Sequence, residues 1–98
     1  MGQLIYGHGD AAIPVDDRTL AHLQVVILNK LRRQEKFVLT LADGTRTRVM
    51  FVGPSTPLEF IYSGNRTPRL NQLWLEQLAK AAGLGEGLHI VREPPDET

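Results

Sequence analysis

The first residues of the chain alternate apolar and polar side chains with a period of two, which is typical of strands with one buried face. Leu4 and Tyr6 precede the segment 7–10, which contains two glycines and an aspartate, and the alternation resumes over 13–15. Because these residue types favour turns, we predict a β-hairpin. Pro14 has no backbone N–H and therefore places the second strand at a sheet edge.

The next pattern has a helical period and runs from Asp16 to Arg33. Asp16 or Asp17 would cap the N-terminus of this amphipathic helix, and basic residues would lie at its C-terminus, as the helix dipole favours. One face is apolar and would pack on a sheet: Leu20, Leu23, Ile27, Leu28 and Leu31. The opposite face would stay exposed: Arg18, His22, Val25, Asn29, Arg32 and Arg33.

A second hairpin is predicted over 37–52, and the length of its loop decides which side chains share a face. A two-residue Asp43-Gly44 loop would place Arg46 and Arg48 in the core. A three-residue loop over 42–44 instead aligns the apolar residues of 37–41 with Thr47, Val49 and Phe51. Burying unpaired arginines costs more than a turn preference, so we predict the longer loop, with both arginines on the outer face.

The remaining pattern predicts a strand over 58–62, a helix that begins at Thr67-Pro68 and ends at Gly83, and a short strand over 88–91. The order of elements is then ββα-βββ-αβ. This order is typical of an α+β fold with two layers: a mainly antiparallel sheet of about five to six strands with both helices on one face. We expect residues 1–92 to form this single domain and residues 93–98 to form a flexible acidic tail.

Composition narrows the functional classes. The 98 residues carry 11 basic and 11 acidic side chains and no cysteine, which argues against a general polyanion binder and excludes thiol chemistry and disulfides. No apolar run is long enough to span a membrane, so we expect a cytoplasmic protein without membrane association. The basic residues are nevertheless concentrated between Lys30 and Arg48.

The segment DDRTLAHLQVVILNKLRR, together with MGQLIYG, PRLNQLWLEQLAKAA and GLHIVREP, resembles a family of uncharacterised bacterial proteins of roughly this length. Members of that family are often labelled as ATP-dependent DNA ligases. Such ligases are similar to one another in a Lys-x-Asp-Gly motif whose lysine takes the adenylate, but here Leu41 stands at the lysine position before Ala42-Asp43-Gly44. The resemblance therefore implies an association with DNA transactions at most.

Two surfaces are candidate sites. We predict a non-catalytic binding or adaptor domain that contacts another protein or itself, as a homodimer, through the outer face of the first helix: Arg18, His22, Val25, Asn29 and Arg33. The alternative is a nucleic-acid accessory domain, associated with DNA ligation, that binds phosphates through a basic patch: Arg32, Arg33, Lys36, Arg46 and Arg48.

The chain does not present a convincing catalytic set, so the balance is against an enzyme. His8, His22 and His89 lack the spacing of metal ligands, and we predict no metal site and no cofactor. The glycine-rich segment 83–87 follows a helix instead of preceding one, which is the wrong end for binding a nucleotide phosphate.

Overall fold

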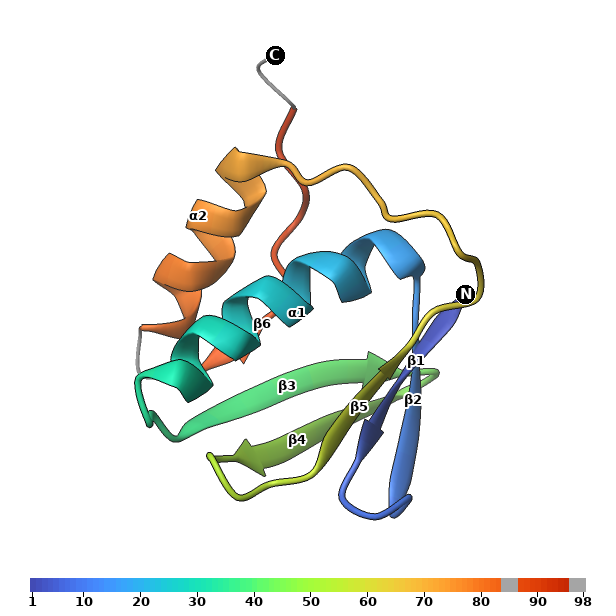
Figure 1. Ribbon diagram of the computed structural model, residues 1–98, viewed down its shortest axis with the longest axis vertical. Helices are drawn as coiled ribbons and strands as arrows, with labels where there is room; N and C mark the ends of the chain where they lie inside the picture. The colour runs from blue at the N-terminus through green and yellow to red at the C-terminus, as the bar shows by residue number, and fades with distance from the viewer. Residues whose placement is uncertain (84–86, 96–98) are drawn as a thin grey trace.

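The computed structural model of the protein describes residues 1–83 and 87–95 and has an α+β architecture (Figure 1). The elements follow the predicted order: β1 (Gly2–Tyr6), β2 (Ala11–Val15), α1 (Asp17–Arg32), β3 (Phe37–Asp43), β4 (Arg46–Val52), β5 (Leu58–Ile61), α2 (Gln72–Ala82) and β6 (Leu88–His89). The prediction of a mainly antiparallel α+β fold with two helices and about five to six strands is confirmed.

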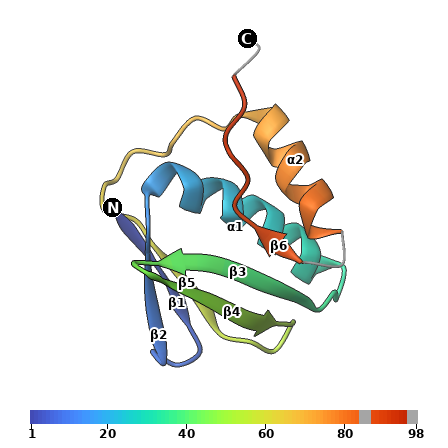
Figure 2. The same ribbon diagram turned by 180° about the vertical axis from the view of Figure 1, so that it is seen from behind.

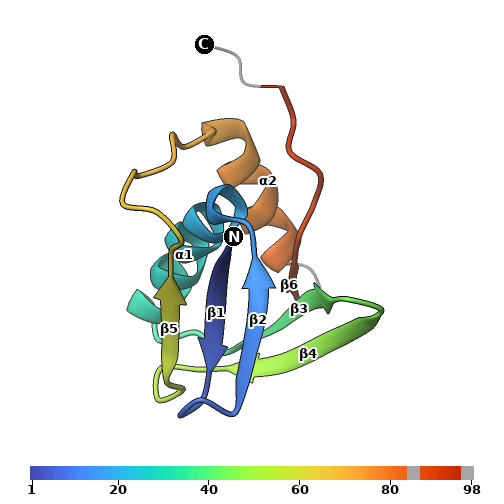
Figure 3. The same cartoon turned by 90° about the vertical axis from the view of Figure 1, so that its right-hand side faces the viewer.

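The strands divide into two three-stranded sheets, with orders β2-β1-β5 and β4-β3-β6. All pairs are antiparallel except β3 with β6, which run parallel. Figure 3 shows β5, β1 and β2 side by side, and Figure 2 shows β6 beside β3 on the side away from β4. Pro14 lies in the edge strand β2 opposite Gln3, as its lack of an N–H predicted.

The helix α1 packs against both β1 and α2. The Asp16 side chain caps it by accepting the backbone N–H of Thr19 at 3.2 Å. The apolar side chains of α1 form one core with residues of both sheets and of α2. Eight side chains of this core have no solvent exposure: Leu4, Ile13, Leu20, Leu23, Ile27, Leu39, Leu78 and Leu88. Leu28, which we expected on this face, is exposed.

The predicted three-residue loop between β3 and β4 is wrong. Asp43 lies opposite Arg46, so the turn consists of Gly44 and Thr45 alone. Gly44 has φ +64°, the conformation that a two-residue hairpin turn requires at its first position. This register turns the other set of β4 residues inward: Met50 and Val52 are buried, whereas Val49 and Phe51 are 56% and 73% exposed.

The two arginines of β4 also differ from the prediction, because they share the inward face with Met50 and Val52. They are tolerated there because they lie near the hairpin end. The Asp43 carboxylate accepts hydrogen bonds from the side chains of Arg46 at 3.2 Å and Arg48 at 3.0 Å. Unpaired arginines would be costly on this face, but Asp43 at the end of β3 supplies their partner.

The helix α2 begins later than predicted. Asn71, rather than Thr67, is its N-cap and accepts the backbone N–H of Trp74 at 3.2 Å. The segment 62–71 is therefore a connection without helix, which passes along α1 before α2 begins (Figure 1). Gly83 caps the C-terminus, as predicted.

Candidate functional site

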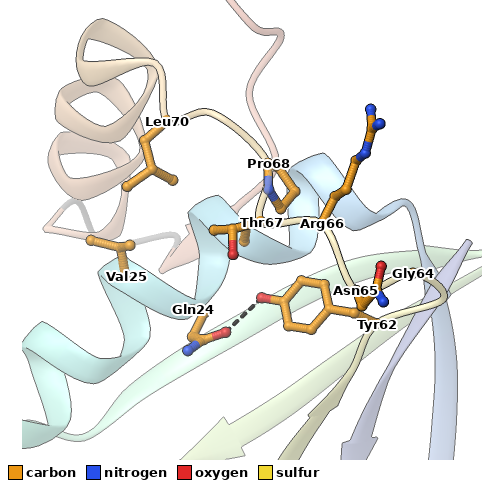
Figure 4. Close-up of a pocket in the computed structure, with 10 residues that line it drawn as sticks. Gln24, Val25, Tyr62, Gly64, Asn65, Arg66, Thr67, Pro68 and Leu70 are labelled. Carbon is orange, nitrogen blue, oxygen red and sulfur yellow. Dashed lines mark hydrogen bonds between the residues drawn. The ribbon is translucent and has the colours of Figure 1, made fainter.

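A groove runs along the side of α1 that faces away from the sheets, and it consists of two adjoining hollows. The first, of about 370 Å³, lies between α1 and the connection 62–71 (Figure 4). The second, of about 290 Å³, lies between α1 and α2. Val25 lines both hollows, so they adjoin at this residue. We call the combined surface the α1 groove; its main lining residues are Gln24, Val25, Asn29, Arg33, Tyr62, Thr67, Pro68, Leu70, Leu75 and Glu76.

One end of the α1 groove is held by a polar contact between the helix and the connection. The Tyr62 hydroxyl donates to Oε1 of Gln24 at 2.5 Å (Figure 4). Burial, and secondarily the negative charge of Asp17, raises the pKa of the Tyr62 phenol, so the hydroxyl keeps its proton and remains a donor. This contact fixes the position at which the connection leaves β5.

The middle of the α1 groove is apolar. Val25 on α1 and Leu70 at the end of the connection face each other across it (Figure 4). Pro68 extends the apolar lining on one side and Leu75 of α2 extends it on the other. All four side chains are only partly buried, so apolar area remains available for contact with another molecule.

The other end of the α1 groove is charged. Asn29 and Arg33 of α1 line the second hollow together with Glu76 of α2. Arg33 is also ion-paired with Glu35 at 2.8 Å. A hydrogen bond from Lys30, and secondarily the charges of Lys30 and Arg33, lowers the pKa of Glu35.

Of the residues predicted for the protein interface, Val25, Asn29 and Arg33 line the α1 groove and Arg18 and His22 do not. The expectation that His22 is exposed is wrong, because its side chain has no solvent exposure. Its Nε2 accepts the backbone N–H of Asn71 at 2.8 Å, and its ring lies 4.5 Å from that of Trp74. His22 is therefore a structural contact between α1 and α2.

Arg18 is also engaged within the domain. Its guanidinium binds both carboxylate oxygens of Glu93, at 2.8 and 2.6 Å, and the backbone carbonyl of Arg69 at 2.6 Å. The hydrogen bond from Arg18, with a second one from Asn71, lowers the pKa of Glu93 to about 2. Glu93 is the first residue of the segment for which we expected a flexible tail; residues 96–98 lie outside the described part of the chain.

The sequence did not predict that Asn71 connects α2 to the segment after β6. It is buried, caps α2, and donates its side-chain amide to Glu93 at 3.0 Å and to the carbonyl of Pro94 at 2.9 Å. An asparagine before an apolar helical pattern is a possible N-cap signal, but the preceding Thr67-Pro68 pair is a stronger one and pointed to an earlier start.

The residues of the predicted basic patch do not come together. Arg32, Arg33 and Lys36 lie between the end of α1 and the start of β3, whereas Arg46 and Arg48 pair with Asp43 at its far end. β3 has seven residues, so the two groups lie roughly 20 Å apart.

Residues 1–83 and 87–95 contain no cluster of three or more His, Cys, Asp or Glu side chains that could hold a metal ion. Neither helix of this part has the length and apolar character required to cross a bilayer. The glycine-rich segment 83–87, from which we expected no nucleotide binding, lies partly outside the described residues.

A family model described as a domain of unknown function, DUF7882, matches residues 1–93. The chain belongs to this family, which covers nearly its whole length and agrees with the resemblance to uncharacterised proteins. No curated protein and no solved structure matches the chain.

Proposed function

We propose that this member of the DUF7882 family is a non-catalytic binding domain that contacts another protein, or a second copy of itself, through the α1 groove. The observation that carries the proposal is the position of Val25. It lies in both hollows and joins an apolar centre to polar groups at each end. Protein interfaces have this organisation, in which a desolvated apolar centre supplies binding energy and a polar rim supplies specificity.

The lining indicates what a partner would present. An apolar side chain would enter between Val25 and Leu70, where it would remove apolar surface from water. A neighbouring polar group would reach Asn29, and a charged one would reach Arg33 or Glu76. Two of the predicted interface residues, Arg18 and His22, would act indirectly by fixing the helices that form the groove.

The test compares Val25→Glu with Val25→Thr. Glutamate places a charge in the apolar centre, whereas threonine keeps the shape of valine and stays neutral. We expect partners recovered from the native cell with the tagged wild-type protein to be retained by Val25→Thr and lost by Val25→Glu. If the protein is a homodimer in light scattering, Val25→Glu should dissociate it. Identical partners and identical mass for both variants would contradict the proposal.

The nucleic-acid alternative makes a different prediction. Binding through Arg32, Arg33, Lys36, Arg46 and Arg48 would weaken steeply with salt and would not respond to Val25→Glu. Three of these arginines already have carboxylate partners: Arg33 pairs with Glu35, and Arg46 and Arg48 share Asp43. The geometry therefore supports the α1 groove better. A DNA mobility shift that appears at low ionic strength and disappears with added salt would support the nucleic-acid alternative instead.

A further inference from the structure

The strand β4 has a free edge, because it is the outermost strand of its sheet. In a hairpin closed by the Asp43–Arg46 pair, alternate residues direct their backbone N–H and C=O groups toward β3. The backbone N–H and C=O groups of the remaining residues point away from β3; these residues are Thr47, Val49 and Phe51. The Tyr6 hydroxyl donates to the Phe51 carbonyl at 2.8 Å, which shows that this carbonyl points outward.

The side chains of the same three residues are exposed on the outer face of the sheet. Phe51 is 73% exposed and Val49 is 56% exposed, although large apolar side chains on a strand normally face a core. Phe51 also lines a hollow of about 540 Å³ with Lys36 and the start of the loop after β4. Among the described residues, no strand pairs with the outer edge of β4, and its backbone at Thr47 and Val49 therefore coincides with an exposed apolar row; the Phe51 carbonyl at one end is occupied by Tyr6.

Charge distinguishes the possible occupants of this edge. At the hairpin end, the single carboxylate of Asp43 is shared by Arg46 and Arg48, which leaves one positive charge in excess. At the other end, Lys36 lines the hollow beside Phe51. The edge thus has an apolar centre and a positive charge at each end, and β4 itself contains no acidic residue.

We propose that the free edge of β4 binds an extended acidic segment of a partner protein by strand addition. The segment would form backbone hydrogen bonds with Thr47 and Val49, place an apolar side chain beside Phe51, and direct carboxylates toward Arg46 and Lys36. A second copy fits less well. Two β4 strands paired antiparallel about Val49 would bring the Arg48 side chains to diagonal positions without an added carboxylate.

This surface lies on a sheet edge and is separate from the α1 groove, so the two proposals can fail independently. The decisive variant is Val49→Pro. Proline removes the outward N–H without removing a hydrogen bond to β3, and edge strands accept it, as Pro14 in β2 shows. Val49→Thr, which keeps the N–H, is the matched control.

The probe is a phage-displayed library of random peptides about ten residues long, the length of a strand, selected on the immobilised full-length protein. We expect the selected peptides to be rich in aspartate and glutamate around apolar positions. Their affinity, measured by fluorescence anisotropy, should fall about tenfold or more in Val49→Pro and in high salt, and should be unchanged in Val49→Thr and in Val25→Glu.

A measurement on the wild-type protein covers the case in which Val49→Pro does not fold. Amide hydrogen exchange at Thr47 and Val49 should slow when a selected peptide is bound. Selection that yields no acidic peptides, equal affinity in Val49→Pro, or unchanged exchange at these two amides would overturn the proposal. A wild-type dimer that Val49→Pro dissociates would overturn the choice of an acidic partner.

Discussion

The backbone N–H of Asn71 donates to Nε2 of His22 across 2.8 Å in the interior of the domain. The other ring nitrogen of His22, Nδ1, lies 2.7 Å from the backbone carbonyl of Arg18. Because Nε2 accepts a hydrogen bond, Nδ1 carries the hydrogen and donates it to that carbonyl. One imidazole therefore joins α1 to the residue that caps α2.

Replacing this imidazole should destabilise the domain. In His22→Leu the backbone N–H of Asn71 loses its buried acceptor, which costs about 1–3 kcal/mol of the free energy of unfolding. Urea denaturation followed by circular dichroism measures the difference. The control is Asn29→Ala, an exposed position on the same helix, which should change stability by less than about 0.5 kcal/mol. Equal effects at the two positions would show that His22 does not join the helices.

The position of His22 shows where the sequence pattern is informative and where it is not. Helical periodicity correctly predicted that Leu20, Leu23 and Ile27 face the core. It also placed His22 on the opposite face, which we took to be exposed. Periodicity describes one helix at a time, whereas the burial of His22 depends on α2, whose start at Asn71 was not predicted.

The observed register of β4 makes a counter-intuitive prediction about side-chain truncation. Phe51 is the larger side chain but is exposed, whereas Met50 is only 6% exposed. Met50→Ala should therefore cost about 2–5 kcal/mol, as deletions in a packed core do. Phe51→Ala should cost less than about 1 kcal/mol. The urea midpoints of the two variants measure this difference. A larger loss of stability in Phe51→Ala than in Met50→Ala would support the register predicted from the sequence.

The register of β4 against β3 was predicted wrongly for a physical reason that the pattern of apolar and polar residues along β4 does not contain. The predicted register would turn Thr47, Val49 and Phe51 inward, whereas the observed one buries Met50 and Val52, and each leaves an apolar pair on the other face. The choice depends on whether Arg48 can be neutralised, and Asp43 does this at 3.0 Å from its place at the end of β3. The order of elements, by contrast, follows from local signals such as caps, turns and period, which is why it was predicted correctly.

Gly44 and Gly64 form a matched pair for testing the turn between β3 and β4. An added Cβ would meet no atom within 4 Å at either position, but only Gly44 has a positive φ, of +64°. Gly44→Ala should therefore lower the free energy of unfolding by about 1 kcal/mol through backbone strain. Gly64→Ala should leave it nearly unchanged or raise it slightly. Thermal denaturation of the two variants separates strain from steric contact, and equal shifts would contradict the two-residue turn.

The pair between Arg18 and Glu93 should give the domain a specific acid sensitivity. Hydrogen bonds from Arg18 and Asn71 hold the pKa of Glu93 at about 2, against an ordinary value of 4.5. The unfolded chain therefore takes up this proton at a higher pH than the folded domain does. The stabilisation is fully present above about pH 4.5 and is lost as the pH falls toward about 2.

Glu93→Gln removes this titrating group, so the stability of the variant should fall less steeply over that range than the stability of the wild type. Part of the slope should remain, because the pKa values of Asp17 and Glu35 are also lowered in the folded domain. Urea midpoints measured from about pH 6 down to about pH 2 test this. Arg18→Gln should flatten the profile in the same way, because the guanidinium is the main cause of the shift. An unchanged slope in Glu93→Gln would show that the segment after β6 is not held by this pair.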